Sequence, residues 1–184
     1  YFKNDAPGVR QDTLGELEFC FTTAPDEESW YDYVSDPVTI RTGAAVDALD
    51  IGALGETVLE DDKLRLVVGQ QDYDDWFGPI VYVYLENKSD KYLGIIAETA
   101  EADGVFCDYI FYSAAVAPGK MAAGSMAFDG ELAELKGFEE LTLTFSRYEA
   151  DTLDELAVYD GEMLEAETVI YPPQVWGEYD NGGM

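Results

Sequence analysis

Much of the chain alternates between apolar and polar residues with a period of two. This period places successive side chains on opposite faces of a β-strand, so it predicts strands with one buried face. Clusters of Gly, Pro, Asn and Asp interrupt the alternation about every 8–12 residues, a spacing typical of antiparallel sheets with short turns. The expected strands lie within residues 63–68, 80–85, 92–97, 105–112, 121–128, 141–145 and 169–171.

Helical periodicity is limited to one short segment, Glu131 to Lys136. An α/β fold would need strands that alternate with long amphipathic helices, and this sequence has no such helices. We therefore expect an all-β fold, an antiparallel β-sandwich with one short helical crossover.

The two most regular strands predict the core of this sandwich. One face of each sheet must be apolar for two sheets to pack together, so the alternating apolar side chains of these strands are expected to be buried. Trp76, which precedes the first of these strands, is expected to plug one end of the core because large aromatic side chains are mostly buried. The predicted core residues are Val81, Val83, Leu85, Leu141, Leu143 and Phe145.

A strand, an acidic turn and a returning strand occur near both ends of the chain. The apolar positions of residues 17–21 match those of residues 141–145 at a constant spacing of 124 residues, which is the size of a domain. This spacing indicates an internal repeat. Two ordinary hairpins that match by coincidence are the alternative.

The first of these hairpins is too small to be stable alone in water, so its apolar face must be covered. That face carries Leu17, Phe19 and Phe21. It can dock onto the rest of the chain, or it can pair with the same segment of a second copy and form a homodimer. Docking within the chain is favoured because it needs no second molecule.

Three stretches of sequence resemble a known type of domain. They are Trp76-Phe77-Gly78-Pro79 leading into residues 81–90, Val116-Ala117-Pro118-Gly119-Lys120, and the strand at 139–145 with its Asp-rich turn. On these residues, the stretch from 64 to 171 resembles an immunoglobulin-like β-sandwich domain of unknown function, found in secreted lipoproteins and surface proteins of Gram-positive gut bacteria. The resemblance implies an immunoglobulin-like fold without catalytic residues, located outside the cell or at the surface of a Gram-positive bacterium.

The segment Asp36-Pro37-Val38-Thr39-Ile40 resembles the closing strand of the same domain. This implies two parts: residues 1–45, a β-hairpin segment from the tail of a preceding copy, and residues 46–184, the immunoglobulin-like β-sandwich. The chain begins at Tyr1 without a signal peptide, so we expect the numbering to start after a removed leader.

The charge balance narrows the range of partners. The chain of 184 residues has 10 Lys and Arg against 39 Asp and Glu, a net charge of −29, while 47% hydrophobic residues suffice for a folded core. The charge repels phosphate backbones, so no nucleic-acid partner is expected, and it favours basic partners and cations. No apolar run approaches the length of a membrane-spanning helix, so no membrane-spanning segment is expected.

The chain contains no histidine, which limits its chemistry. Ser-His-Asp and Cys-His nucleophiles, His-ligated metals and imidazole acid–base catalysis are all excluded. The two cysteines, Cys20 and Cys107, can form at most one disulfide. Cys20 lies on the strand face opposite Phe19 and Phe21, so we expect two free thiols and leave the bridge open.

One acidic cluster is a candidate for weak cation binding. Asp72, Asp74 and Asp75 occur together in the turn before Phe77-Gly78-Pro79, and Ca²⁺ prefers oxygen ligands. The cluster does not fit a twelve-residue calcium-binding loop, so its carboxylates are interpreted first as solvated turn residues. No cofactor is expected beyond weak Ca²⁺ binding.

Aromatic residues beside carboxylates are candidate ligand contacts, because aromatic faces stack on sugars and on Lys or Arg side chains. Trp30, Tyr31 and Tyr33 lie in one acidic turn, and Tyr73 lies in another. The alternative is that these rings fold back over the ends of the sandwich.

These observations together predict an extracellular, non-enzymatic binding, adhesion or assembly module whose partner is a protein or a carbohydrate. A structural spacer in a tandem surface array is one alternative. The other is a carboxylate-based polysaccharide hydrolase, which would need two carboxyl groups in an aromatic cleft.

Overall fold

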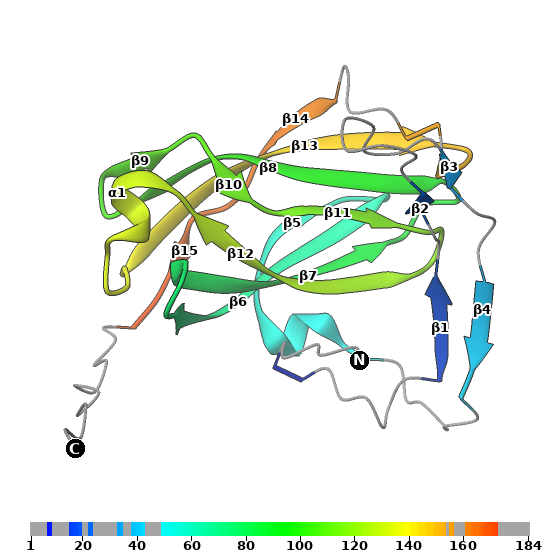
Figure 1. Cartoon of the computed structure of the whole chain (residues 1–184), viewed down its shortest axis with the longest axis horizontal. Helices are drawn as coiled ribbons and strands as arrows, with labels where there is room; N and C mark the ends of the chain where they lie inside the picture. Colours follow the sequence, from blue (N-terminus) through cyan, green and yellow to red (C-terminus); the bar gives the residue numbers. More distant parts are fainter. Residues whose placement is uncertain are drawn as a thin grey trace.

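Two antiparallel β-sheets pack face to face in the computed structural model (Figure 1). The structure describes residues 7–8, 15–19, 22–23, 33–34, 38–42, 49–153, 155–156 and 161–172. The first sheet contains, in order across the sheet, β10 (Ile110–Phe111), β12 (Met121–Phe128), β7 (Gly78–Asn87), β6 (Leu64–Asp74) and β5 (Gly55–Glu60). The second contains β11 (Ser113–Val116), β8 (Tyr92–Ala102), β13 (Glu140–Ala150) and β14 (Glu162–Glu165), with β9 (Val105–Cys107) beside β8 and β15 (Val169–Ile170) beside β13.

The expected all-β fold and its antiparallel sandwich are confirmed. The six predicted core residues lie between the sheets, and each is at most 1% exposed. β7 is apolar on both faces, and its outward-facing Tyr82 and Tyr84 form a smaller cluster with Ile51 and Val67. The short 3-10 helix η2 (Ile51–Leu54) covers this part of the outer face. The resemblance to an immunoglobulin-like domain stays a prediction.

The short helical crossover is also confirmed. The helix α1 (Gly130–Ala133) follows β12, and the side chain of Asp129 accepts a hydrogen bond from the N–H of Gly130 (2.8 Å) at its start. Within the described ranges, no helix has the length and apolar character needed to cross a membrane.

Residues 105–112 differ from the single strand that the sequence predicts. β9 and β11 pair with β8 in the second sheet, whereas β10, which lies between them in the chain, pairs with β12 in the first. The Sγ of the buried Cys107 lies 3.1 Å from the carbonyl oxygen of Tyr109 and 3.5 Å from that of Asp129, and its single S–H is shared between these two acceptors. These contacts lie at the turn that carries the chain from one sheet to the other. Cys107 is a free thiol, and Cys20 lies outside the described residues.

The N-terminal segment forms two short antiparallel pairs. β1 (Glu16–Phe19) pairs with β4 (Val38–Arg41), as the predicted hairpin requires, and β2 (Thr22–Thr23) pairs with β3 (Tyr33–Val34). The described residues do not include the side chains of Leu17, Phe19 and Phe21, so what covers this apolar face is not described.

Two contacts join the N-terminal segment to the sandwich of the same chain. Glu16 forms an ion pair with Lys120, and the Tyr84 hydroxyl donates a hydrogen bond to the carbonyl oxygen of Pro7 (2.7 Å). These contacts agree with docking within the chain. The division at residue 45 and the homodimer stay predictions.

The two hairpins of the proposed repeat share their direction but not their register. At the 124-residue spacing β4 falls on β14, and both strands are antiparallel to their partners. Phe19 pairs with Val38, so the spacing would pair Leu143 with Glu162, yet Glu162 pairs with Arg147. The register therefore differs by four residues, and the similarity lies in the apolar pattern.

Candidate functional site

The turn between β6 and β7 exposes its aromatic residues. Trp76 is 85% exposed and Phe77 is 46% exposed, so the prediction that Trp76 plugs the core is wrong. The side chain of Asp74 accepts hydrogen bonds from the N–H groups of Trp76 (2.8 Å) and Phe77 (3.1 Å). An Asp side chain that binds backbone groups in this way closes a tight turn, and here it keeps both rings outside the core.

Other side chains fill the end of the core that Trp76 was expected to plug. The ring of Phe138 lies 5.8 Å from that of Phe128 and 5.7 Å from that of Tyr171, in both cases edge to face. The buried amide of Gln71 accepts a hydrogen bond from the Phe138 N–H (3.1 Å) and donates one to its carbonyl oxygen (2.6 Å). The core is therefore closed without the tryptophan.

Two more exposed rings lie beside this turn. Tyr109 precedes β10 and is 60% exposed, and Phe111 in β10 is 44% exposed. The ring centroid of Phe111 lies 5.8 Å from that of Phe77 and 5.0 Å from that of Tyr109. We call Trp76, Phe77, Tyr109 and Phe111 the aromatic end. The sequence pattern did not identify Tyr109 and Phe111 as candidate site residues, because it placed them in an ordinary strand. Aromatic residues occur on both faces of that stretch, and one face of a sandwich strand is exposed, so some of these rings could have been expected at the surface.

Gly78 holds the turn of the aromatic end against α1, so its replacement by alanine should destabilise the protein. Its φ is +75°, and an added Cβ would lie 2.1 Å from the backbone oxygen of Ala133. We expect Gly78→Ala to lower the free energy of unfolding, measured by chemical denaturation, by about 2–3 kcal/mol. Gly104→Ala is the matched control: its φ is +82° but no atom lies within 4 Å, so it should cost about 1 kcal/mol. Equal losses would mean that the close approach to α1 is unimportant.

The aromatic end continues onto the outer face of the first sheet. Four residues form a row across neighbouring strands, each paired with the next: Asp72 in β6, Ile80 in β7, Ala127 in β12 and Phe111 in β10. Residues that face each other across an antiparallel sheet share one side of it. This row therefore runs from an exposed carboxylate in β6 to an exposed ring in β10, the edge strand of this sheet.

A shallow depression of about 410 Å³ lies next to Phe111, where the chain passes from the first sheet to the second. Its lining holds no charged residue and includes Ile96, Ile110, Tyr112, Ser113 and Ser125. Burial raises the pKa of Tyr112, and its hydroxyl makes no hydrogen bond to the described residues. The depression is therefore an apolar hollow with hydroxyl groups in its lining.

The candidate cation ligands lie at the end of β6 and in the turn that follows it. Asp72 accepts hydrogen bonds from the N–H of Tyr73 (2.8 Å) and the hydroxyl of Tyr82 (3.2 Å), Asp74 closes the turn above, and Asp75 is exposed. In the part of the chain that the structure describes, no group of three or more Asp, Glu or Cys side chains is placed to hold a metal ion. Weak Ca²⁺ binding stays a prediction without support from this geometry.

The four predicted ligand contacts are not brought together among the described residues. Tyr73 is 39% exposed, and the Lys136 Nζ lies 5.2 Å from the centroid of its ring. Tyr33 lies in β3, which Figure 1 shows at the other end of the molecule from α1. Trp30 and Tyr31 lie outside the described residues. Of these candidates, the structure places Tyr73 beside the aromatic end.

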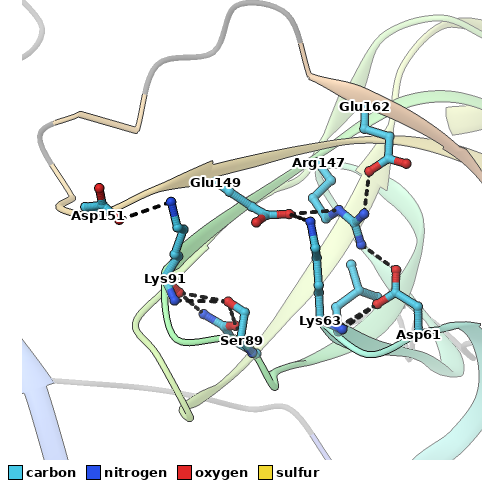
Figure 2. A network of polar contacts seen from close by, with 10 residues as sticks. Asp61, Lys63, Ser89, Lys91, Arg147, Glu149, Asp151 and Glu162 are labelled. Carbon is cyan, nitrogen blue, oxygen red and sulfur yellow. Dashed lines mark hydrogen bonds and ion pairs between the residues drawn. The ribbon is translucent and has the colours of Figure 1, made fainter.

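Most described cations lie at the opposite end of the sandwich, in ion pairs (Figure 2). The Arg147 side chain is 6% exposed and pairs with Asp61 (2.5 Å) and with Glu162, while Lys63 pairs with Glu149 (2.6 Å). Further pairs at this end are Lys88–Glu60, Lys91–Asp151 and Arg65–Asp50.

The two ends of the sandwich therefore differ in charge. Asp72, Asp75 and Asp108 are exposed at the aromatic end. Among the residues that the structure describes there, Lys136 supplies the positive charge, and it lies over the Tyr73 ring.

No family model, no curated protein and no solved structure matches this chain. The resemblance on sequence motifs therefore stays a proposal, as do the location and partner that it implies. The features of the structure that bear on function are the exposed rings, the carboxylates near them and the depression beside Phe111.

Proposed function

We propose that this protein is a non-enzymatic binding module that acts outside the cell or at the cell surface, with the aromatic end as its contact surface. The observation that carries this proposal is the exposure of Trp76 next to Phe77, whose exposed ring belongs to a contacting group with Phe111 and Tyr109. Trp and Tyr are the residue types that contribute most binding energy at interfaces, and clustered exposed apolar side chains mark interaction sites on soluble proteins.

The aromatic end also favours binding over the two alternatives. A spacer in a tandem array would account for the repeated hairpin but would leave the exposed rings without a role. A hydrolase would need paired carboxyl groups in a cleft, and the depression beside Phe111 has no carboxylate in its lining. The extracellular setting rests on the resemblance of residues 64–171 and is part of the proposal.

Binding through the aromatic end can be measured with the full chain and three defined probes: deca-arginine, deca-glutamate and the neutral oligosaccharide maltoheptaose. We expect at least one probe to bind in isothermal titration calorimetry. The double variant Trp76→Ala, Phe111→Ala should weaken that binding by about tenfold or more, because it removes two rings of the contact surface.

The matched control is Met163→Ala in β14. Met163 is 60% exposed and lies away from the aromatic end, so its loss should leave the affinity unchanged. Thermal melts of all variants would establish that each is folded. If no probe binds, or if the double variant binds every probe as the wild type does, the proposed function is wrong.

A further inference from the structure

We propose that the aromatic end binds a cationic segment of a partner protein, in which Lys or Arg side chains lie over the exposed rings and pair with the neighbouring carboxylates. This inference rests on the proposed function and names the chemical class of its ligand.

The protein itself already binds a cation in this way beside the aromatic end. The Lys136 Nζ lies 5.2 Å from the centroid of the Tyr73 ring, a distance at which the negative face of the ring attracts an ammonium group. Tyr73 lies in β6, within four residues of both Trp76 and Phe77. A Lys or Arg side chain from a partner would make the same contact with those more exposed rings.

Charge complementarity favours a basic partner at this end. Asp72, Asp75 and Asp108 are exposed beside the rings, whereas the described cations at the opposite end are held in ion pairs. A net charge of −29 attracts a cationic segment from a distance, and the local carboxylates then fix where it binds.

The arrangement of the rings favours a peptide over a sugar. Phe77 is tilted 54° to Phe111, and Tyr109 stands at 88° to it. A sugar ring stacks on a flat aromatic face, but these three contacting rings do not form one flat surface. The flexible stems of Lys and Arg can follow such an uneven surface, because their methylene groups pack on apolar side chains while the charged group stays in water.

The depression beside Phe111 would take an uncharged side chain from the same segment. Its lining is apolar with hydroxyl groups and carries no charge. The ligand is therefore a segment in which basic residues flank an apolar one. The carboxylates at this end are not grouped as metal ligands within the described ranges, which separates this surface from a cation site.

The test uses a synthetic peptide with arginines on both sides of a central leucine, measured by calorimetry against the full chain. We expect it to bind more weakly as salt is added, because screening removes the charge attraction. The triple variant Asp72→Asn, Asp75→Asn, Asp108→Asn should weaken binding by about tenfold or more, as should Trp76→Ala with Phe111→Ala.

The matched control removes the same number of charges elsewhere. Glu56, Glu165 and Glu167 are exposed along the opposite edge of the sandwich, so the triple change of these residues to Gln should alter the affinity little. Equal weakening by the two triple variants would overturn the inference, since it would mean that overall charge alone attracts the peptide.

The same experiment separates this inference from the proposed function. If maltoheptaose binds through Trp76 and the arginine peptide does not, the ligand class is wrong and the binding surface stands. If neither maltoheptaose nor the arginine peptide shows binding that Trp76→Ala weakens, the proposed function and the inferred ligand class are both wrong. Melting temperatures close to that of the wild type would show that the variants remain folded.

Discussion

Replacing Arg147 by alanine is expected to lower the free energy of unfolding by about 3 kcal/mol, the lower end of what removing one partner of a buried ion pair costs. The guanidinium joins β13 to Asp61 in the turn between β5 and β6 and to Glu162 in β14, so it holds three elements together. Both carboxylates are partly exposed and become hydrated when the arginine is removed. We therefore expect the loss of unfolding free energy to fall at the lower end of that range. Chemical denaturation would measure it.

Two control variants and the pH dependence sharpen this prediction. Glu162→Gln should cost less than about 1 kcal/mol because Glu162 is 60% exposed. Burial alone would raise the pKa of Asp61, but hydrogen bonds from Arg147 and from the N–H groups of Leu64 and Lys63 hold this pKa below its ordinary value of 3.8. The stability that Asp61 contributes is therefore fully present above about pH 5 and is lost as the pH falls through its lowered pKa. Asp61→Asn should remove this acid-side loss.

A loss of less than about 1 kcal/mol for Arg147→Ala would contradict the structural role of the network, because exposed pairs contribute no more than that. Arg147→Met offers a further check. It keeps the packing of the side-chain stem, so it should recover part of the stability that the alanine variant loses.

Leu143→Ala is expected to lower the free energy of unfolding by about 2–5 kcal/mol, the range for a large-to-small change in a packed core. Leu143 is 1% exposed and belongs to the core between the two sheets. The alanine would lose buried apolar surface and leave a cavity. Thermal and chemical denaturation of the variant would measure the loss.

The matched control for Leu143 lies on the other face of the same strand. Thr142 is half-buried, and its hydroxyl lies 3.1 Å from that of Thr168, so Thr142→Ala should cost less than about 1 kcal/mol. Similar losses for the two variants would mean that the assigned faces of β13 are wrong.

Most of the strands and their buried faces could be predicted from the sequence because the period of two is a local property, although β5 was not among the expected strands. Val83 and Leu143 are buried as their alternation requires, and the one-turn helix at Gly130–Ala133 overlaps the first half of the expected segment, Glu131 to Lys136. The candidate site could not be predicted in this way. Residue 76 is a tryptophan, a residue type that is mostly buried. Here it is exposed because Asp74 closes a turn that keeps it outside the core, and because Phe138 fills the end of the core instead.

Contacts between distant segments account for the remaining differences. The alternation over residues 105–112 predicts one strand, yet the structure divides this stretch because β9 pairs with β8 and β10 pairs with β12. The local sequence pattern cannot predict which strands pair. Arg147 occupies a position of β13 whose side chain points inward, although it is charged. Its ion-pair partner Asp61 lies 86 residues away in the sequence. Sequence alone thus determined the all-β class, the core faces and the acidic charge, since each depends on neighbouring residues or on composition. Only the tertiary structure decided which rings are exposed and where each charge is paired, because both depend on how distant segments pack together.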